Sequence, residues 1–284
     1  MTSEKKLEAV RVLLYTVIAC GLCYGLFAAV PGEQQTSLAM FTPLTAAILT
    51  RIITKDKPRD AKDLLLGLEL KGKLRYYLYA VGFGILLNLI GAALCAAWFY
   101  GRYDLAEQLS SENARAALKT LPFSICASVY LVFICFGEEY GWRAYLTPKL
   151  EKLMPEGAAL IVQGIIWGMW HKPVLDMGLN FGKETPLFPW LNYALMCISC
   201  IFIGTFLTWL TKKTGSIYPA ALCHSAVDLC NIMLSIVIPA DLPKNDPSVN
   251  LPVGVLLMIP FPMITAVICL VMTAREKKHS EAVT

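Results

Sequence analysis

Long apolar runs separated by short polar segments dominate this chain. Runs of about 18 residues or more predict membrane-spanning helices. The runs lack strand-like alternation, and a backbone in lipid must pair its polar groups internally, so we expect every span to be helical. The sequence predicts about eight spans, at about 9–30, 37–53, 76–100, 121–150, 158–170, 189–210, 216–238 and 251–274.

The polar segments between the spans predict a topology. Lysine and arginine concentrate in 51–75 and in the segments that would share its side of the membrane, which hold most of the 25 such residues. By the positive-inside rule, both termini are then cytoplasmic. Within 51–75, the stretch AKDLLLGLEL alternates charge and leucine at helical spacing, which predicts a short amphipathic helix at the interface.

Composition supports a polytopic membrane protein and excludes several other classes. Of 284 residues, 56% are hydrophobic and only 16% are charged, less charge than a soluble domain carries. With no internal repeat and no soluble segment, we expect residues 1–284 to form one membrane domain. No basic patch interleaved with aromatic residues occurs, so no nucleic-acid partner is expected. The ten cysteines lie in apolar runs and are expected to pack as small apolar side chains.

The most informative stretch is Gly137 to Arg143, which places ionisable residues inside an apolar run. Ionisable groups inside a membrane segment indicate a functional site. Glu139 and Arg143 are four residues apart on a helix and share a face, so they are expected to pair. Glu138 points about 100° away and is free to meet groups from other helices. A purely structural ion pair is the alternative.

Two histidines and a further acid also lie in predicted spans. His171 ends one span, while His224 and Asp228 share one face of another, four residues apart. Counted from the membrane surface, Glu138, His171 and His224 fall at one depth. We therefore expect one polar site shared by three helices, with Asp228 contacting a histidine.

These residue types predict hydrolysis. A glutamate beside a histidine can act as a general base on water, and a second histidine can stabilise an oxyanion. No Gly-x-Ser-x-Gly elbow is present. Glutamate and histidine are also zinc ligands, but the His-Glu-x-x-His motif is absent. We therefore expect no cofactor, with zinc as the alternative.

Three motifs resemble those of the CAAX protease and bacteriocin-processing family, also called the Abi family. Residues 138–146 (EEYGWRAYL) resemble its EExxxR motif in the prokaryotic form EExGWRxYL. Residues 167–171 (WGMWH) resemble FxxxH, with Trp167 for phenylalanine, and 224–228 (HSAVD) resemble HxxxN or HxxxD. The resemblance spans about 120–235.

The resemblance implies an intramembrane endopeptidase related to type II CAAX prenyl endopeptidases, in the cytoplasmic membrane of a prokaryote. Carried over by position, Glu138 would activate water with help from His171, and His224 and Asp228 would line the oxyanion side. Glu139, Arg143 and Trp167 would shape the site. The substrate would be a membrane-associated peptide, prenylated or not. Asp228 departs from the asparagine of the prenyl endopeptidases, and an ionised aspartate cannot donate to an oxyanion.

Three other hypotheses remain at this point. A zinc protease would use the same residues. A carrier would use Glu138 and Asp228 as a proton relay, although the chain shows no inverted repeat or paired broken helices. A membrane scaffold would need every in-membrane ionisable residue to be structural, which is costly.

Overall fold

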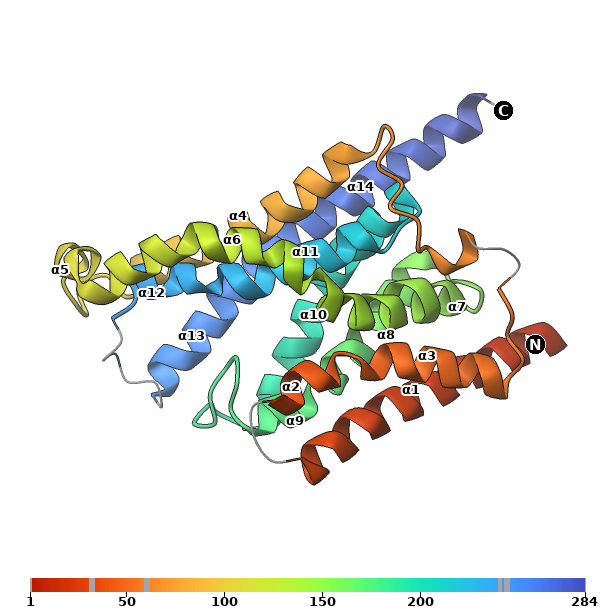
Figure 1. Cartoon of the computed structure of the whole chain (residues 1–284), viewed down its shortest axis with the longest axis horizontal. Coiled ribbons are helices and arrows are strands. Elements are labelled where there is room, and N and C mark those ends of the chain that lie inside the picture. The colour runs from red at the N-terminus through yellow and green to blue at the C-terminus, as the bar shows by residue number, and fades with distance from the viewer. Residues whose placement is uncertain (1, 31–33, 59–61, 240–241, 243–245, 284) are drawn as a thin grey trace.

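The structure, a computed structural model, describes residues 2–30, 34–58, 62–239, 242 and 246–283, and every named element in these ranges is a helix (Figure 1). This confirms the predicted all-α class. The α-helices are α1 (Ser3–Ala29), α2 (Gln34–Ala39), α3 (Thr42–Ile53), α4 (Leu74–Trp98), α5 (Leu105–Ser110), α6 (Glu112–Glu139), α7 (Thr147–Glu151), α8 (Glu156–Trp170), α9 (Lys172–Asp176), α10 (Trp190–Thr214), α11 (Tyr218–Leu229), α12 (Leu234–Val237), α13 (Pro247–Met258) and α14 (Pro260–Val283). Two 3₁₀ helices, η1 (Lys62–Leu64) and η3 (Cys230–Met233), and a π-helix, η2 (Tyr140–Leu146), complete the set.

Six helical segments in the described residues are long and apolar enough to cross a membrane. A seventh follows if Glu112–Ala127 and Val129–Glu151, which meet at a 58° bend, form one broken span. The predicted span at 158–170 corresponds to α8, which has 15 residues and is about 22 Å long at 1.5 Å per residue. That is shorter than the roughly 30 Å hydrocarbon core, so the count of eight is not confirmed, and the cytoplasmic placement of the termini stays a prediction.

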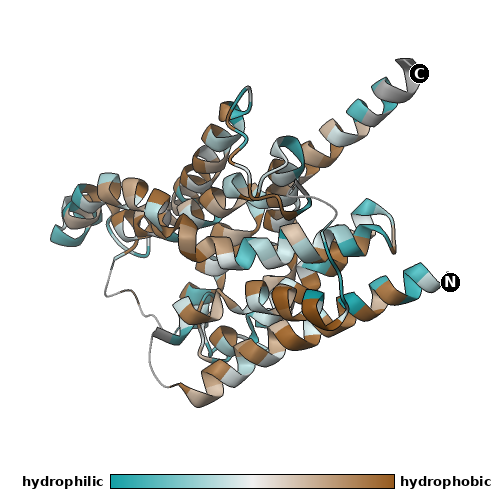
Figure 2. Cartoon of the chain, turned by 45° about the vertical axis from the view of Figure 1, so that its right-hand side comes forward, coloured by the Kyte–Doolittle hydropathy of each residue, from teal (hydrophilic) through white to brown (hydrophobic). Residues whose placement is uncertain are grey.

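Apolar side chains cover the outside of the long helices. Figure 2 shows hydrophobic residues along the helices and hydrophilic ones towards the N-terminus and in the loops. Large apolar residues such as Leu13, Leu78 and Ile264 are more than half exposed. Lipid tails are the medium in which such a surface is stable.

Two predicted spans are each built from two helices. The second is α2 followed by α3, with Pro43 in the first turn of α3, where a missing N–H costs nothing. The last is α13 followed by α14, which begins at Pro260, because proline cannot continue the hydrogen-bond ladder of α13. The fourth span begins earlier than predicted, at Glu112, because Ser111 caps α6 by accepting from the Ala114 N–H at 3.1 Å.

The predicted amphipathic helix at 61–70 is wrong in the part that the structure describes. Only the three residues of η1 are helical there, and the chain then runs on without helix to Leu70. Leu65 and Glu69 have positive φ, at 56° and 49°, which no right-handed helix contains. The Leu65 carbonyl instead accepts from the Ile217 N–H at 3.1 Å.

Small residues let the helices that carry the site approach closely. A Cβ on Gly164 or Gly168 of α8 would lie 2.5 Å from Ile201 or 2.6 Å from Cys197 of α10. Gly84 of α4 meets α11 in the same way, and the Asn88 amide beside it donates to the Val227 carbonyl at 3.0 Å. Small residues and interhelical hydrogen bonds are the usual means of helix association in lipid.

A cluster of charges joins α1, α7 and the turn after α3. Asp56 lies 2.7 Å from the Lys149 ammonium and 3.4 Å from the Arg11 guanidinium. Glu8, only 3% exposed, pairs with Arg11 at 2.9 Å and with Lys149 at 3.4 Å. These pairs bring the N-terminal helix against the segment that follows the π-helix.

We predict that Asp56→Asn destabilises the fold in a pH-dependent way. Burial raises the pKa of the Asp56 carboxyl, but the Lys149 hydrogen bond and the charges of Lys149, Arg11 and Arg51 outweigh it and hold the pKa below its ordinary value of 3.8. A carboxylate with a lowered folded pKa stabilises the fold above pH 3.8, and the effect is lost as the pH falls through the folded pKa. We expect the variant to lose about 3 kcal/mol at neutral pH, as when a buried ion pair is broken.

Thermal unfolding of the detergent-solubilised protein, followed from pH 7 downwards, measures this difference. Asp104→Asn is the control, because asparagine caps α5 as well as aspartate does. A difference between wild type and Asp56→Asn that persisted undiminished below pH 3 would contradict the assignment.

Candidate functional site

The glutamate pair sits where α6 changes into the π-helix. Glu139 ends α6, and all seven residues of η2 are buried. π-Helical turns are rare and frequently mark functional sites. A Cβ on Gly137 would lie 2.8 Å from the Met40 carbonyl, and one on Gly141 would lie 2.4 Å from Pro43. Glycine on both sides of the pair thus lets the α2–α3 junction pack directly against it.

The predicted Glu139–Arg143 pair is present and completely enclosed. Arg143 Nη1 lies 3.1 Å from both oxygens of Glu139, and both side chains are 0% exposed. Arg143 Nε and Nη2 have no protein partner among the described residues. The guanidinium carbon lies 4.1 Å from the centre of the Trp167 ring, a cation–π contact that partly replaces the lost solvation.

His224 of α11 contacts both glutamates. Its Nδ1 lies 2.8 Å from Glu139 Oε1 and 3.7 Å from Glu138 Oε2. A carboxylate only accepts, so the Nδ1–H donates to Glu139. Glu139 therefore joins a cation from its own helix to the ring of a second helix, and its position fixes His224.

Trp167, which its motif position predicts only to shape the site, also makes a hydrogen bond to Glu138. Its indole Nε1–H donates to Glu138 Oε2 at 3.3 Å, while its ring covers Arg143 and meets the His224 ring edge-on at 5.7 Å. A phenylalanine would keep the ring contacts and lose the donated hydrogen bond. The indole N–H is therefore the feature of this chain that orients Glu138.

His171 follows the last residue of α8, and its ring is held by the helix itself. Its Nδ1 lies 2.8 Å from the Trp167 carbonyl. A carbonyl only accepts, so Nδ1 carries the proton and Nε2 is the nitrogen that remains for other partners. The Trp170 ring packs edge-on against His171 at 4.9 Å, and the Trp170 indole donates to Thr42 of α3 at 3.0 Å.

Helix α1 holds the end of α8 in place. The last carbonyls of a helix lack intrahelical partners. Here the Tyr24 hydroxyl donates to the Met169 carbonyl at 2.6 Å, and the Cys23 thiol donates to the Trp170 carbonyl at 3.6 Å. Both residues lie in α1, outside every predicted motif, so the sequence carried no signal for this contact.

The four predicted catalytic residues, Glu138, His171, His224 and Asp228, line one cavity of about 340 Å³. Asp228 lies at its open side, 49% exposed, with Oδ2 3.8 Å from His224 Nε2. Its predicted histidine neighbour is thus His224, at the edge of pairing distance. Sequence reasoning missed most of the cavity wall, including Phe27 of α1 and Met40 after α2.

The described residues contain one group of side chains arranged to hold a metal ion. Ligand atoms of Glu138, Glu139 and His224 lie within 4.8 Å of one another. Two features oppose a divalent cation there. The Arg143 guanidinium already pairs with Glu139, and His224 Nδ1 would have to lose the proton that it donates to Glu139 before it could offer a lone pair.

The arrangement can activate water. Glu138 has a fixed orientation, is 2% exposed and opens on the cavity, and the His171 ring lines the same space with Nε2 uncommitted. A carboxylate and a neutral imidazole around one small cavity provide two bases for one water molecule. The His224 ring faces the glutamates and Asp228 from the other helix.

A comparison with protein-family models matches the part of the chain that contains these residues. Residues 120–230 match the family model described as Rce1-like, type II CAAX prenyl endopeptidase Rce1-like. A segment of 103 residues, 35% of this chain, is 30% identical to a protein of Methanococcus maripaludis named CAAX prenyl protease 2. The match spans 37% of that relative's length, so this chain is similar to it over little more than a third of that protein.

We predict that Tyr24→Phe alters the environment of His171 while leaving the fold intact. Loss of one hydrogen bond costs about 1 kcal/mol, but it frees the end of α8 that carries the ring. The control is Tyr103→Phe, which removes a similar 2.6 Å bond to the Val237 carbonyl away from the site. The chain has 3 histidines, so ¹⁵N-histidine NMR of labelled protein resolves the effect. The His171 signals should shift in Tyr24→Phe alone; equal spectra of the two variants would refute the positioning role.

Proposed function

We propose that this protein is an intramembrane endopeptidase in which a glutamate activates the attacking water, because residues 120–230 match the Rce1-like model of type II CAAX prenyl endopeptidases. The observation that carries the proposal is the placement of Glu138. It is buried, oriented by the Trp167 N–H, and lines one cavity with His171, His224 and Asp228.

Glu138 and His171 are the proposed base pair for water. Glu139 is bound by Arg143 and His224, so it is not free to accept a proton. Glu138 has one indole donor and a more distant histidine, which leaves acceptor capacity for a water O–H. The Nε2 of His171 can accept from the same water, because its Nδ1–H is committed to Trp167. After attack, the proton collected by this pair is available to the leaving amine.

His224 is the proposed stabiliser of the tetrahedral intermediate. Its Nδ1–H is committed to Glu139, so Nε2 is the atom that can face the substrate carbonyl. Asp228 lies 3.8 Å from that nitrogen. We propose that Asp228 orients the imidazole and favours its protonated form, which then donates to the oxyanion. This assigns Asp228 the role of an acceptor, the only role that an ionised carboxylate can fill.

The cavity fits a substrate that is apolar for part of its length. Its polar residues lie beside apolar ones such as Phe27, Met40 and Leu179, contributed by α1, the α2–α3 junction and the segment after α9. The relative from Methanococcus maripaludis is named as a CAAX prenyl protease. We therefore propose a membrane-associated peptide as the substrate, with a prenylated C-terminal peptide as the first to test.

Glu138→Gln should abolish cleavage without unfolding the protein. Glutamine is nearly isosteric and can still accept from Trp167, but it cannot take a proton, so we expect a loss on the order of 10²–10⁴-fold. The assay is cleavage of a fluorogenic farnesylated peptide by detergent-purified protein, and Glu184→Gln, at an exposed loop residue, is the control. Full activity in Glu138→Gln would exclude the glutamate mechanism, whereas no activity in the wild type would exclude this substrate.

A zinc-dependent protease at the same residues is the second candidate, because Glu138, Glu139 and His224 can approach one ion. It predicts stoichiometric zinc in the purified protein and loss of cleavage with a strong chelator. Our proposal predicts activity that survives chelation, with elemental analysis showing far less than stoichiometric zinc. Zinc-restored activity after chelation would replace the glutamate mechanism by metal activation of water.

A further inference from the structure

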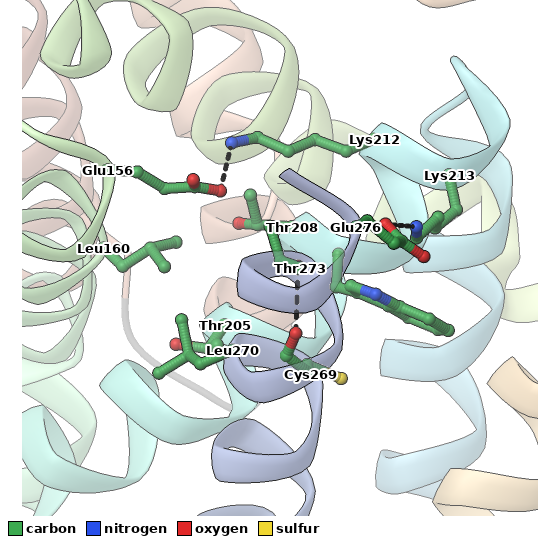
Figure 3. A pocket seen from close by; sticks show the side chains of 11 residues that line it. Glu156, Leu160, Thr205, Thr208, Lys212, Lys213, Cys269, Leu270, Thr273 and Glu276 are labelled. Carbon is green, nitrogen blue, oxygen red and sulfur yellow. Dashed lines mark hydrogen bonds and ion pairs between the residues drawn. The ribbon is translucent and has the colours of Figure 1, made fainter. Parts of the chain in front are cut away.

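A second cavity, of about 160 Å³, lies between the end of α10, the start of α8 and the middle of α14 (Figure 3). None of its lining residues lines the cavity of the candidate active site. Its rim carries both signs of charge. Lys212 pairs with Glu151 and, at 2.7 Å, with Glu156, and Lys213 pairs with Glu276.

The hydroxyl of Thr208 is the first sign that this cavity takes a ligand. Threonines on helices usually donate to the carbonyl four residues earlier. Three others on α10, Thr205, Thr211 and Thr214, do so at 2.7 to 3.0 Å. Thr208 is only 4% exposed and lines the cavity, yet its Oγ1 has no partner among the described residues.

The indole of Trp209 is the second sign. Its ring is fixed against Phe206 at 5.9 Å and against Tyr76 at 5.6 Å. The residue is 9% exposed, and its Nε1–H also has no partner among the described residues. Buried indole N–H groups usually find an acceptor, and Trp209 also lines this cavity.

The polar groups are layered along the helix axis. Lys212 lies one turn beyond Thr208, about 6 Å further towards the end of α10. Below the donors, Leu160 of α8 and Leu270 of α14 line the cavity. Exposed apolar residues of α14, among them Val267 and Val271, continue this surface outwards. The order is therefore charged groups, neutral donors, then apolar surface.

We propose that this cavity binds one glycerophospholipid with an amine-bearing headgroup. Its phosphate would bind Lys213, its ester carbonyls would accept from Thr208 and Trp209, and its acyl chains would run along α14. The same order of groups, phosphate, ester and chain, is built into the lipid.

The charges at the rim of the cavity favour a headgroup that carries an amine. An ammonium has three donors, and the Lys213–Glu276 pair is exposed on the Glu276 side, at 53%. Such a pair is weak, so a phosphate can replace Glu276 at Lys213. An ammonium with N–H donors can then pair with the released Glu276 carboxylate. A phosphoethanolamine headgroup supplies one, whereas the quaternary ammonium of phosphocholine has no N–H.

Lipid titration followed by native mass spectrometry of the full-length, delipidated protein tests the proposal. The ligands are phosphatidylethanolamine and phosphatidylcholine with the same chains, phosphatidylglycerol, and the chain-free glycerophosphoethanolamine. The variants are Thr208→Val and Trp209→Phe. Thr211→Val is the matched control, because that hydroxyl already donates to the Leu207 carbonyl one turn away. Thermal unfolding verifies that each variant is folded.

We expect phosphatidylethanolamine to bind most tightly and its affinity to fall about five- to tenfold in Thr208→Val, the value of one hydrogen bond. Trp209→Phe should show a similar fall, and Thr211→Val none. Equal affinities for the ethanolamine and choline lipids would overturn the headgroup assignment, and tighter binding of phosphatidylglycerol would replace it by an anionic lipid. Equal binding of glycerophosphoethanolamine would exclude a role for the chains, and unchanged affinity in both variants would overturn the site.

Discussion

The enclosed ion pair of Glu139 and Arg143 is the constraint on which the rest of the site depends. Two charges that are 0% exposed must each meet an opposite charge or a donor. Arg143 meets one carboxylate and the face of Trp167, and Glu139 meets that guanidinium and the His224 ring. The pair thereby fixes a side chain on each of two other helices, α8 and α11. Glu138, one residue away, is left with the acceptor capacity that the proposed mechanism uses.

The architecture around this pair is an assembly of short and broken helices. α8 has 15 residues, α3 has 12, and α2 is separated from α3 by two residues. In lipid, the freed backbone groups at each break need internal partners. The C-terminal end of α8 is an example, because Tyr24 and Cys23 donate to carbonyls of the same turn that presents His171. The residue that follows α8, His171, therefore lines the cavity of the candidate site.

Much of the fold and of the candidate site could be predicted from the sequence. The features that could not be predicted have physical reasons. The Glu139–Arg143 pair follows from i,i+4 spacing, and the gathering of Glu138, His171 and His224 follows from their common depth. The indole N–H of Trp167 and the hydroxyl of Tyr24 were beyond reach, because tertiary contacts choose which polar groups of an aromatic residue are used. The amphipathic pattern at 61–70 predicted a helix that does not form. The Leu65 carbonyl accepts from the Ile217 N–H instead, and the positive φ of Leu65 and Glu69 is incompatible with a right-handed helix. The roles of the site residues stay predictions until variants are assayed.

The π-helix imposes a restriction on chain length. From Tyr140 to Leu146 each turn holds more residues than an α-helix does, and the whole segment is buried. Removing or adding one residue there would rotate everything downstream by about 100° relative to the glutamate pair. Lys149 would then leave Asp56 and Glu8, to which it is bound at 2.7 and 3.4 Å. One residue more or fewer in this segment would therefore separate the Glu139–Arg143 pair from the charge cluster of Asp56, Glu8 and Lys149.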